Sequence, residues 1–234
     1  MSGIVVVRQR GSAGHLHGLD PFADGPVETP QVWVCSVDAP AIVLGSRQRP
    51  ELLDVDACAR EGLEVVRRRS GGGAVLLRPD AVVWIDLVLP PGSVPDDIRA
   101  SMVWAGERWC EALVAVGAAG DRLLVHRGGM VSSPWSDLVC FAGVGPGEVL
   151  VDGRKLVGLS QRRTRHGIRV QGQVHRRSLV SEMPRLFAVD VPADPVPEPA
   201  LLADAGMTAG LTAVVDAELA AAMAASMEAR ITPV

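Results

Sequence analysis

The sequence predicts an α/β (α+β) domain built around a mixed, largely antiparallel sheet that is flanked by helices. Stretches that alternate like strands outnumber stretches with helical periodicity, and most of them follow one another directly along the chain, which favours antiparallel pairing. Apolar residues make up 48% of the 234 residues. This is enough for a sizeable core in one large domain, or in a domain with a small appendage.

The first 30 residues are rich in glycine, proline and histidine and show little periodicity. We expect a short strand near Ile4–Arg8 and then an irregular arm that contains His15 and His17. Two histidines without a third ligand seldom make a metal site. We therefore interpret both as exposed loop residues and predict no bound metal.

The next part of the chain predicts three strands and one helix. Val32–Val37 and Ala41–Leu44 are strands, separated by the turn-forming sequence Asp-Ala-Pro. Pro50–Arg60 is a helix, because proline is favoured in a first helical turn and a glycine follows soon after the end. Glu64–Arg67 is a further short strand.

Two longer elements follow. Ala81–Leu89 alternates like a half-buried strand, with Val83, Ile85 and Leu87 on one face. Asp96–Val116 is the clearest helix, because apolar residues recur at steps of three and four behind two N-terminal aspartates. These apolar positions are Ile98, Met102, Ala105, Trp109, Leu113 and Val116.

Leu138–Val174 predicts several strands. They are broken by the glycine-rich stretch Gly143–Gly147 and by the tight turn Asp152-Gly153. A helix is expected directly after them, over Arg176–Leu186.

The C-terminal part has a different composition. Prolines at positions 192, 195, 197 and 199 indicate a spacer, and the alanine-rich Leu211–Arg230 predicts a final helix. We therefore expect a main domain at residues 1–190. Residues 191–234 would be a proline-rich spacer with a C-terminal helix packed on that domain.

Composition excludes several functional classes. The net charge of −4 gives no reason to expect a nucleic acid partner, and the arginine-dense Arg162–Arg169 is as well explained by a solvated strand and loop as by binding. No run approaches the roughly 18 apolar residues of a spanning helix. The N-terminus has no basic region before an apolar run, so we expect no signal peptide and no membrane partner.

The four cysteines are widely spaced and include no Cys-x-x-Cys pair: Cys35, Cys58, Cys110 and Cys140. This spacing argues against a structural zinc site and against a disulfide scaffold. We expect a reduced, cytoplasmic setting in which at least three of the four are unreactive core residues.

The most informative segment is Arg67–Val75, which reads RRRSGGGAV. Three consecutive glycines leave backbone N–H groups open to the polar groups of a ligand. Arg67 and Arg68 add positive charge that suits a carboxylate or a phosphate. The alternative is a flexible hairpin tip, which the crowding of arginines against the glycines disfavours.

A second informative segment is Val149–Gln161. The turn Asp152-Gly153 places Lys155 near the start of the returning strand, where a lysine can polarise a carbonyl or neutralise a phosphate. Gly158 lets a ligand lie close to that strand. A lysine after a hairpin is by itself usually only solvated. The segment is not a P-loop, because no Ser or Thr follows the lysine.

Together these segments resemble the lipoate- and octanoate-protein ligase and transferase superfamily, the biotin/lipoate protein ligase catalytic domain. The first is similar to the motif R-R-x-S-G-G-G-A-V and the second to D-G-R-K-I-x-G. Leu44–Arg49 is similar to the G-x-x-Q segment that precedes them in that superfamily. The order and spacing agree over about residues 30–175.

The resemblance implies a fold shared with biotin ligases and class II synthetase cores, and a catalytic domain at residues 1–190. In it the glycine loop and Lys155 hold an acyl chain and its activated carboxyl group. The implied substrate-binding residues are Gln48, Arg67, Arg68, Ser70, Gly71, Gly72, Gly73 and Gly158. The chain departs from the family after the glycines. An aromatic, a histidine and an acidic residue usually stand there, where this chain has Leu76-Leu77-Arg78.

Cys140 favours a transferase. It is followed by Phe and stands fifteen positions before Lys155, a spacing that resembles the thiol-dependent octanoyl transferases. A thiolate can take octanoate from acyl carrier protein as a thioester and pass it to a lysine amine. Lys155 or Arg67 could supply the positive charge that lowers the pKa of such a thiol.

Two alternatives stay open. The first is ATP-dependent lipoate ligation through lipoyl-adenylate, with ATP and Mg²⁺. It is favoured because Ser-Gly-Gly-Gly is the ligase form of the loop, whereas thiol-dependent enzymes tend to have Thr-Gly-Gly-Arg. In that case Cys140 is a packing residue. A non-catalytic member that binds a lipoyl-like ligand or an adenylate is the second. The implied acceptors are lipoyl domains of 2-oxoacid dehydrogenases or the glycine-cleavage H protein.

Overall fold

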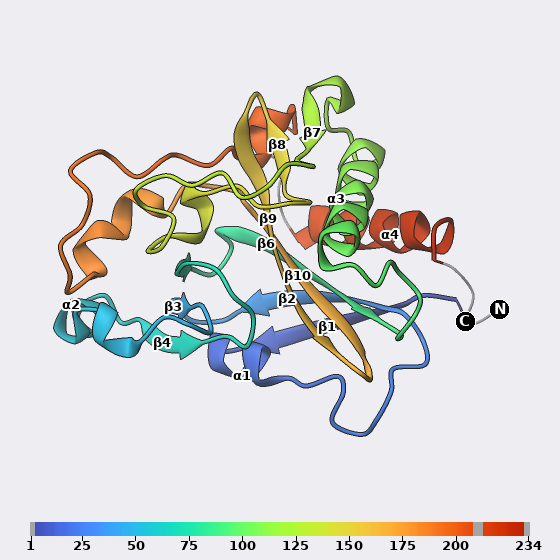
Figure 1. Cartoon of the computed structure of the whole chain (residues 1–234), viewed down its shortest axis with the longest axis horizontal. Coiled ribbons are helices and arrows are strands. Elements are labelled where there is room, and N and C mark those ends of the chain that lie inside the picture. Colours follow the sequence, from blue (N-terminus) through green and yellow to red (C-terminus); the bar gives the residue numbers. More distant parts are fainter. Residues whose placement is uncertain (1–2, 208–212, 232–234) are drawn as a thin grey trace.

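The computed structural model describes residues 3–207 and 213–231. These residues form two sheets with helices around them (Figure 1). The larger sheet has seven strands in the order β1-β2-β6-β10-β9-β8-β7, and the smaller has three in the order β4-β3-β5. Neighbouring strands are antiparallel except in the parallel pairs β1–β2 and β3–β4. The predicted mixed, largely antiparallel sheet with flanking helices is confirmed.

The strands of the two sheets are β1 (Val5–Gly11), β2 (Gln31–Val37), β3 (Ala41–Leu44), β4 (Glu64–Arg67), β5 (Val75–Leu77), β6 (Val82–Leu89), β7 (Leu123–Val125), β8 (Val149–Val151), β9 (Arg154–Thr164) and β10 (Gly167–His175). The α-helices are α1 (Ala13–Gly18), α2 (Val55–Arg60), α3 (Ile98–Ala115) and α4 (Ala213–Glu228). Short 3₁₀-helices are η1 (Pro50–Leu52), η2 (Gly120–Arg122), η3 (Cys140–Ala142), η4 (Val180–Glu182), η5 (Pro184–Leu186) and η6 (Leu202–Ala205).

One face of the large sheet packs against α3 and α4 (Figure 1). Val83, Ile85 and Leu87 of β6 lie in this core, as their alternation predicts, together with the fully buried Trp109 of α3. Trp109 packs directly on the backbone of β10, because a Cβ on Gly172 would lie only 2.5 Å from its indole nitrogen. A glycine is therefore required where the helix meets the sheet.

The opposite face of β6 is buried too, so the expectation of a half-buried strand is wrong. Trp84, Asp86 and Val88 on this face are at most 4% exposed. Helix α1 and the small sheet cover them, with Leu16 and Val43 in the same apolar cluster. A strand between two layers reads as a nearly continuous apolar run rather than a clean alternation.

The turn after β2 carries the chain from the large sheet to the small one. The two predicted strands on either side of this turn both form, but they do not pair with each other. Strand β3 instead pairs with β4 and β5, and both its faces are buried: Ile42 and Leu44 point into one core cluster and Val43 into another. The small sheet thus forms a wall facing the large sheet.

Several elements differ from the prediction for identifiable reasons. The arm after β1 is helical, because Ser12 caps α1 by accepting a hydrogen bond from the backbone N–H of His15 (3.3 Å). The helix expected over Pro50–Arg60 divides into η1 and α2, because Asp54 caps a new start by accepting from the Ala57 N–H (2.8 Å).

Two further segments are less regular than predicted. Arg176–Leu186 forms η4 and η5 instead of a helix, because Pro184 lacks an N–H and its ring disfavours a continuous α-helix. Residues 140–142 form η3 rather than a strand, and regular strands begin only at Val149.

The C-terminal part packs on the rest of the chain. The backbone N–H of Ala200 donates to the carbonyl of Lys155 (2.8 Å), and Met223 and Met227 of α4 are fully buried in the core that contains α3. Residues 211 and 212 of the predicted final helix lie outside the described residues, and the domain boundary at residue 190 stays a prediction. Within the described ranges, no helix is both long and apolar enough to cross a membrane.

Candidate active site

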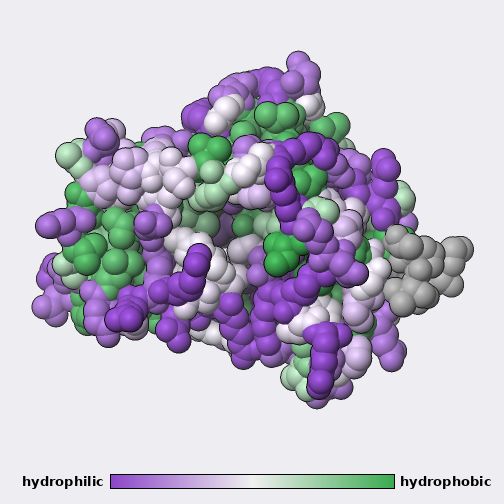
Figure 2. Space-filling model, viewed as in Figure 1, coloured by the Kyte–Doolittle hydropathy of each residue, from purple (hydrophilic) through white to green (hydrophobic). Residues whose placement is uncertain are grey.

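A pocket lies between the large and the small sheet. Its walls come from β6, β9 and β10 on one side and from β3 and β5 on the other, and α1, η3 and Arg68 close it; Gly71, Gly72 and Gly73 are not in its lining. About 440 Å³ of space lies between these walls, part of it open to solvent. The molecule is hollowed near the middle of the face drawn in Figure 2.

Arg68 holds the glycine loop (residues 71–73) in place through its side chain. Its side chain is buried, and its guanidinium donates to the carbonyls of Gly71 and Gly73 (both 2.8 Å) and of Val43 (3.3 Å). Burial lowers the pKa of Arg68, and the nearby Cys140 side chain opposes that shift. A fixed positive group thus stands at the base of the loop.

The glycines allow three backbone segments to pack against one another. A Cβ on Gly73 would lie 2.7 Å from the backbone nitrogen of Cys140, and one on Gly45 would lie 1.8 Å from the carbonyl oxygen of Gly72. The Ala74 N–H donates to the Leu138 carbonyl (2.7 Å), and the Cys140 N–H donates to the Ala74 carbonyl (3.0 Å). The glycine loop is therefore fixed directly beside Cys140.

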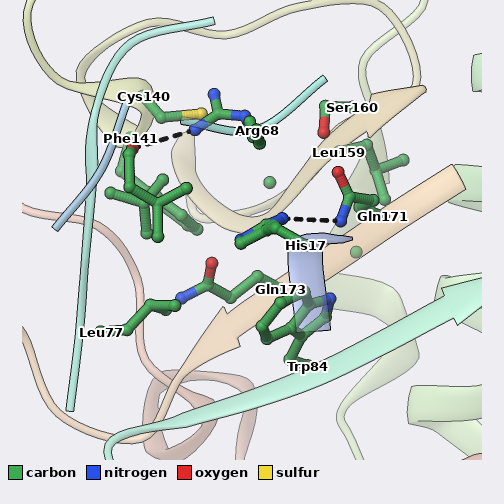
Figure 3. A pocket seen from close by; sticks show the side chains of 14 residues that line it. His17, Arg68, Leu77, Trp84, Cys140, Phe141, Leu159, Ser160, Gln171 and Gln173 are labelled. Atoms are coloured by element: carbon green, nitrogen blue, oxygen red, sulfur yellow. Dashed lines mark hydrogen bonds between the residues drawn. The ribbon is translucent and has the colours of Figure 1, made fainter. Parts of the chain in front are cut away.

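Cys140 lies in η3, is partly buried and lines the pocket. Its Sγ would be 3.6 Å from a Cβ on Gly72, and Figure 3 shows it next to Arg68. The other three cysteines lie away from the pocket lining. Burial raises the pKa of each of their thiols, to about 11 in Cys110. Their packing in the apolar clusters and their raised thiol pKa values favour the prediction that these three are unreactive.

Lys155 is buried behind Cys140 and is not part of the pocket lining. Its Nζ donates to the carbonyl of Cys140 (2.7 Å) and to both carboxylate oxygens of Glu148 (2.9 and 3.0 Å). Glu148 also accepts from the backbone N–H groups of Gly145 (2.7 Å) and Leu159 (3.1 Å). In this arrangement Lys155 holds the backbone of Cys140.

Ser70 begins a chain of polar side chains across the pocket. Its hydroxyl lies 3.0 Å from that of Ser160 and donates to Gln171 Oε1 (2.9 Å). The Gln171 amide donates to His17 Nδ1 (3.3 Å), and the His17 ring packs on Trp84 with centroids 4.6 Å apart. Figure 3 shows this link.

His17 is neutral at physiological pH. Burial, together with the charges of Arg68 and Arg169, lowers its pKa from 6.5 to about 3. The expectation of an exposed loop residue is therefore wrong for His17, because α1 places its ring in the pocket.

The remaining predicted residues differ in position. Gly158 lines the pocket, where a Cβ would lie 2.9 Å from the ring of Phe141. Gln48 lies outside it and braces the neighbouring loops, accepting from the Gly45 N–H (3.0 Å) and donating to the Asp137 carbonyl (2.8 Å). Arg67 is exposed. Because successive side chains along a strand point to opposite sides, Arg67 points away from the pocket that its buried neighbour Arg68 lines.

The model of the lipoyl protein ligase A/B catalytic domain matches residues 24–209. The chain belongs to this family. Its fold is similar to that of lipoate-protein ligase A bound with ATP (TM-score 0.72, 15% identity, 97% of this chain and 86% of that one). It is also similar to a T. acidophilum protein with bound lipoic acid (TM-score 0.69, 15% identity, 97% and 87%).

A further similar fold is the bi-partite lipoate protein ligase of Thermoplasma acidophilum, described with its E2 lipoyl domain (TM-score 0.70, 15% identity, 97% and 84%). Among curated proteins, none matches the sequence. The family consists of lipoyl-protein ligases and transferases, and this chain is accordingly an enzyme of the acyltransferase or ligase type.

The departure from the usual family sequence after the glycines has a defined place in the structure. Leu77, at the position where the resemblance implies a histidine, lines the pocket, and Leu76 points into the core on the other side. Arg78 turns away and pairs with Glu61 (3.0 Å) and Glu182 (2.7 Å). Leu76 and Arg78 therefore serve packing and ion pairing, whereas Leu77 adds apolar surface to the pocket.

Several residues at or near the site carry no clear signal in the sequence, among them His17, Glu148, Ser160 and Gln171. Glu148 stands just before the hairpin that carries Lys155. A buried lysine needs a carboxylate partner, so Glu148 would be the candidate partner if Lys155 were known to be buried. His17 had no such signal, because only tertiary packing of α1 brings it to the pocket.

Proposed function

We propose that this enzyme transfers an octanoyl group from acyl carrier protein to a lysine of a lipoyl domain through a thioester on Cys140. One observation carries the proposal: the Cys140 sulfur lines the pocket beside the buried guanidinium of Arg68. A thiol in an electropositive, partly exposed position is suited to act as a nucleophile. The positive neighbour is Arg68 rather than Arg67 or Lys155.

In the first step the Cys140 thiolate attacks the thioester carbonyl of the octanoyl carrier. The carbon–sulfur bond to the carrier breaks. The carrier leaves as a thiol, because its sulfur takes up the proton that Cys140 gave up. In the second step the neutral amine of the acceptor lysine attacks the new thioester. An amide forms, and the amine proton passes to the Cys140 sulfur as it leaves.

The chain's own residues support these steps in three ways. Arg68 stabilises the thiolate electrostatically and shapes the glycine loop through the carbonyls of Gly71 and Gly73. Lys155, charge-paired with Glu148, fixes the backbone of Cys140. Aliphatic and aromatic side chains in the pocket offer a site for the acyl chain.

The second candidate function is ATP-dependent lipoate-protein ligation. It is favoured by the Ser-Gly-Gly-Gly form of the loop and by the likeness of the fold to an ATP-bound ligase. Lipoate and ATP would react to a lipoyl-adenylate and pyrophosphate, with Mg²⁺ on the phosphates. The acceptor lysine would then displace AMP. Cys140 would have no chemical role.

A lipoyl domain or the glycine-cleavage H protein would be the acceptor in either case. The two functions separate when the purified enzyme is incubated with a lipoyl domain and either octanoyl-acyl carrier protein without ATP or lipoate with ATP and Mg²⁺. The proposal expects modification from the first mixture, loss of it in Cys140→Ser and retention in Cys110→Ser. Cys110 is a matched control, because it is also partly buried but lies in α3. Modification only from the second mixture, undiminished in Cys140→Ser, would make the enzyme a ligase.

A further inference from the structure

The polar side chains that cross the pocket have a fixed hydrogen-bond direction, which begins at Asp86. This side chain is fully buried, and its two oxygens accept from Trp84 Nε1 (2.5 Å) and Arg169 Nε (2.8 Å). Because both partners can only donate, Asp86 is a carboxylate that only accepts. Burial raises its pKa, and the side chains of Arg169, Trp84 and Gln171 act against that rise. Only a donor stabilises a carboxylate, so Gln171 turns its N–H side toward Asp86.

The orientation of Gln171 fixes the direction of the remaining hydrogen bonds. Its amide nitrogen donates to His17 Nδ1 (3.3 Å). Its carbonyl oxygen accepts the single hydroxyl hydrogen of Ser70 (2.9 Å). The hydrogen between the hydroxyls of Ser70 and Ser160, 3.0 Å apart, therefore comes from Ser160. Ser160 Oγ has no other partner among the described residues, so toward the pocket it acts only as an acceptor.

Ser160 presents this acceptor near Cys140. Both side chains line the pocket and are partly exposed, and Figure 3 shows them at the same end of it. Ser70, the partner of Ser160, stands directly before the glycine loop. A Cβ on Gly72 of that loop would lie 3.6 Å from the Cys140 sulfur. This end of the pocket thus combines a nucleophilic sulfur with a neutral hydrogen-bond acceptor.

A neutral acceptor suits an attacking amine better than it suits a thioester. The carbonyl oxygen and the sulfur of a thioester cannot donate a hydrogen bond, whereas an amine nitrogen carries hydrogens. As the amine attacks the carbonyl carbon, its nitrogen gains positive charge and its N–H groups become stronger donors. A hydrogen bond from the amine to Ser160 is therefore stronger in the transition state than before the attack, which accelerates the reaction.

We infer that Ser160 is a catalytic residue of the second step, in which its hydroxyl oxygen accepts a hydrogen bond from the attacking amine of the acceptor lysine. Asp86, acting through Gln171 and Ser70, is a positioning residue that keeps the Ser160 oxygen free for this bond. Ser160 neither takes up nor gives up a proton, and the amine proton still passes to the departing Cys140 sulfur. The inference rests on the proposed function, because it requires an octanoyl thioester on Cys140.

Measuring the two steps separately in Ser160→Ala tests the inference. Intact-protein mass spectrometry follows formation of the octanoyl-enzyme from octanoyl-acyl carrier protein. The isolated octanoyl-enzyme is then mixed with a lipoyl domain or with dithiothreitol. We expect formation to change less than about twofold and transfer to the lipoyl-domain lysine to slow about tenfold, as the loss of one hydrogen bond implies. Transfer to dithiothreitol should keep its rate, because an attacking thiolate has no hydrogen to donate.

Two further variants serve as controls. Ser160→Thr keeps the hydroxyl and should transfer to lysine faster than Ser160→Ala. Ser101→Ala removes a buried hydroxyl that contacts Gln161 (3.1 Å) outside the pocket lining, and it should keep wild-type rates. Equal slowing toward lysine and dithiothreitol in Ser160→Ala, no slowing toward lysine, or no recovery in Ser160→Thr would overturn the inference. A wild type that forms no octanoyl-enzyme would instead count against the proposed function.

Discussion

Acidification should destabilise the folded enzyme through the buried His175 and the partly buried His17, and His175 gives the clearer case. It is 2% exposed, packs edge-to-face on Phe141 (centroids 4.3 Å apart), and neither ring nitrogen has a partner among the described residues. Burial lowers its pKa from 6.5 to about 4; the nearby backbone of Arg177, too far or too poorly aligned for a hydrogen bond, opposes this shift weakly, and the charge of Lys155 adds to it. The folded state therefore holds this imidazole in its neutral form.

The sign and size of the effect follow from proton linkage. Below the unfolded pKa of 6.5 the unfolded chain binds a proton that folded His175 refuses, so stability falls as the pH falls toward 4. At about pH 5 the loss relative to about pH 8 is about 2 kcal/mol for His175. His17, with its pKa at about 3, adds a similar amount. Such a loss is a large part of a typical stability of about 5–15 kcal/mol.

Urea unfolding followed by tryptophan fluorescence at the two pH values measures this difference. Because Asp86 and Asp216 have raised pKa values and act in the opposite direction, the comparison is made between wild type and a single variant. His175→Leu should lower the acid-induced loss by about 2 kcal/mol. An acid-induced loss unchanged in His175→Leu would refute the linkage argument.

Three other substitutions test the geometry around Cys140. In Gly73→Ala the new Cβ would meet the Cys140 backbone at 2.7 Å. This variant should lower the free energy of unfolding in urea by about 1–3 kcal/mol and slow acyl transfer. A fully active variant of unchanged stability would contradict the packing. Glu148→Gln leaves a buried lysine without its counter-charge and should cost about 3–5 kcal/mol, measured the same way, and a loss below about 1 kcal/mol would argue against the buried pair. Lys155→Ala should abolish modification of a lipoyl domain, scored by mass spectrometry, and ordinary activity would remove Lys155 from the site.

Much of the fold follows from local patterns. Glu64–Arg67 forms the predicted strand with the same bounds, and α3 begins two residues inside the predicted helix because Asp97 caps it through the N–H of Ala100 (2.7 Å). Which strands pair is not local. The apolar run of β3 suits any buried strand, and only packing of both its faces separates it from β2.

The site shows the same division. The segments that contain Arg68, Cys140 and Gly158 carry family motifs or spacing, and the structure brings all three to one pocket. The position of Lys155 behind Cys140 could not be predicted, because a lysine after a hairpin is ordinarily solvated and its burial depends on Glu148. His17 enters from a helix whose short sequence lacks a recognisable pattern.

The central claim is that Cys140 carries the acyl group. Intact-protein mass spectrometry of the enzyme after incubation with octanoyl-acyl carrier protein, without ATP, tests it most directly. We expect a mass gain of one octanoyl group that is absent in Cys140→Ser and present in Cys110→Ser. No gain in the wild type, or an equal gain in Cys140→Ser, would contradict it.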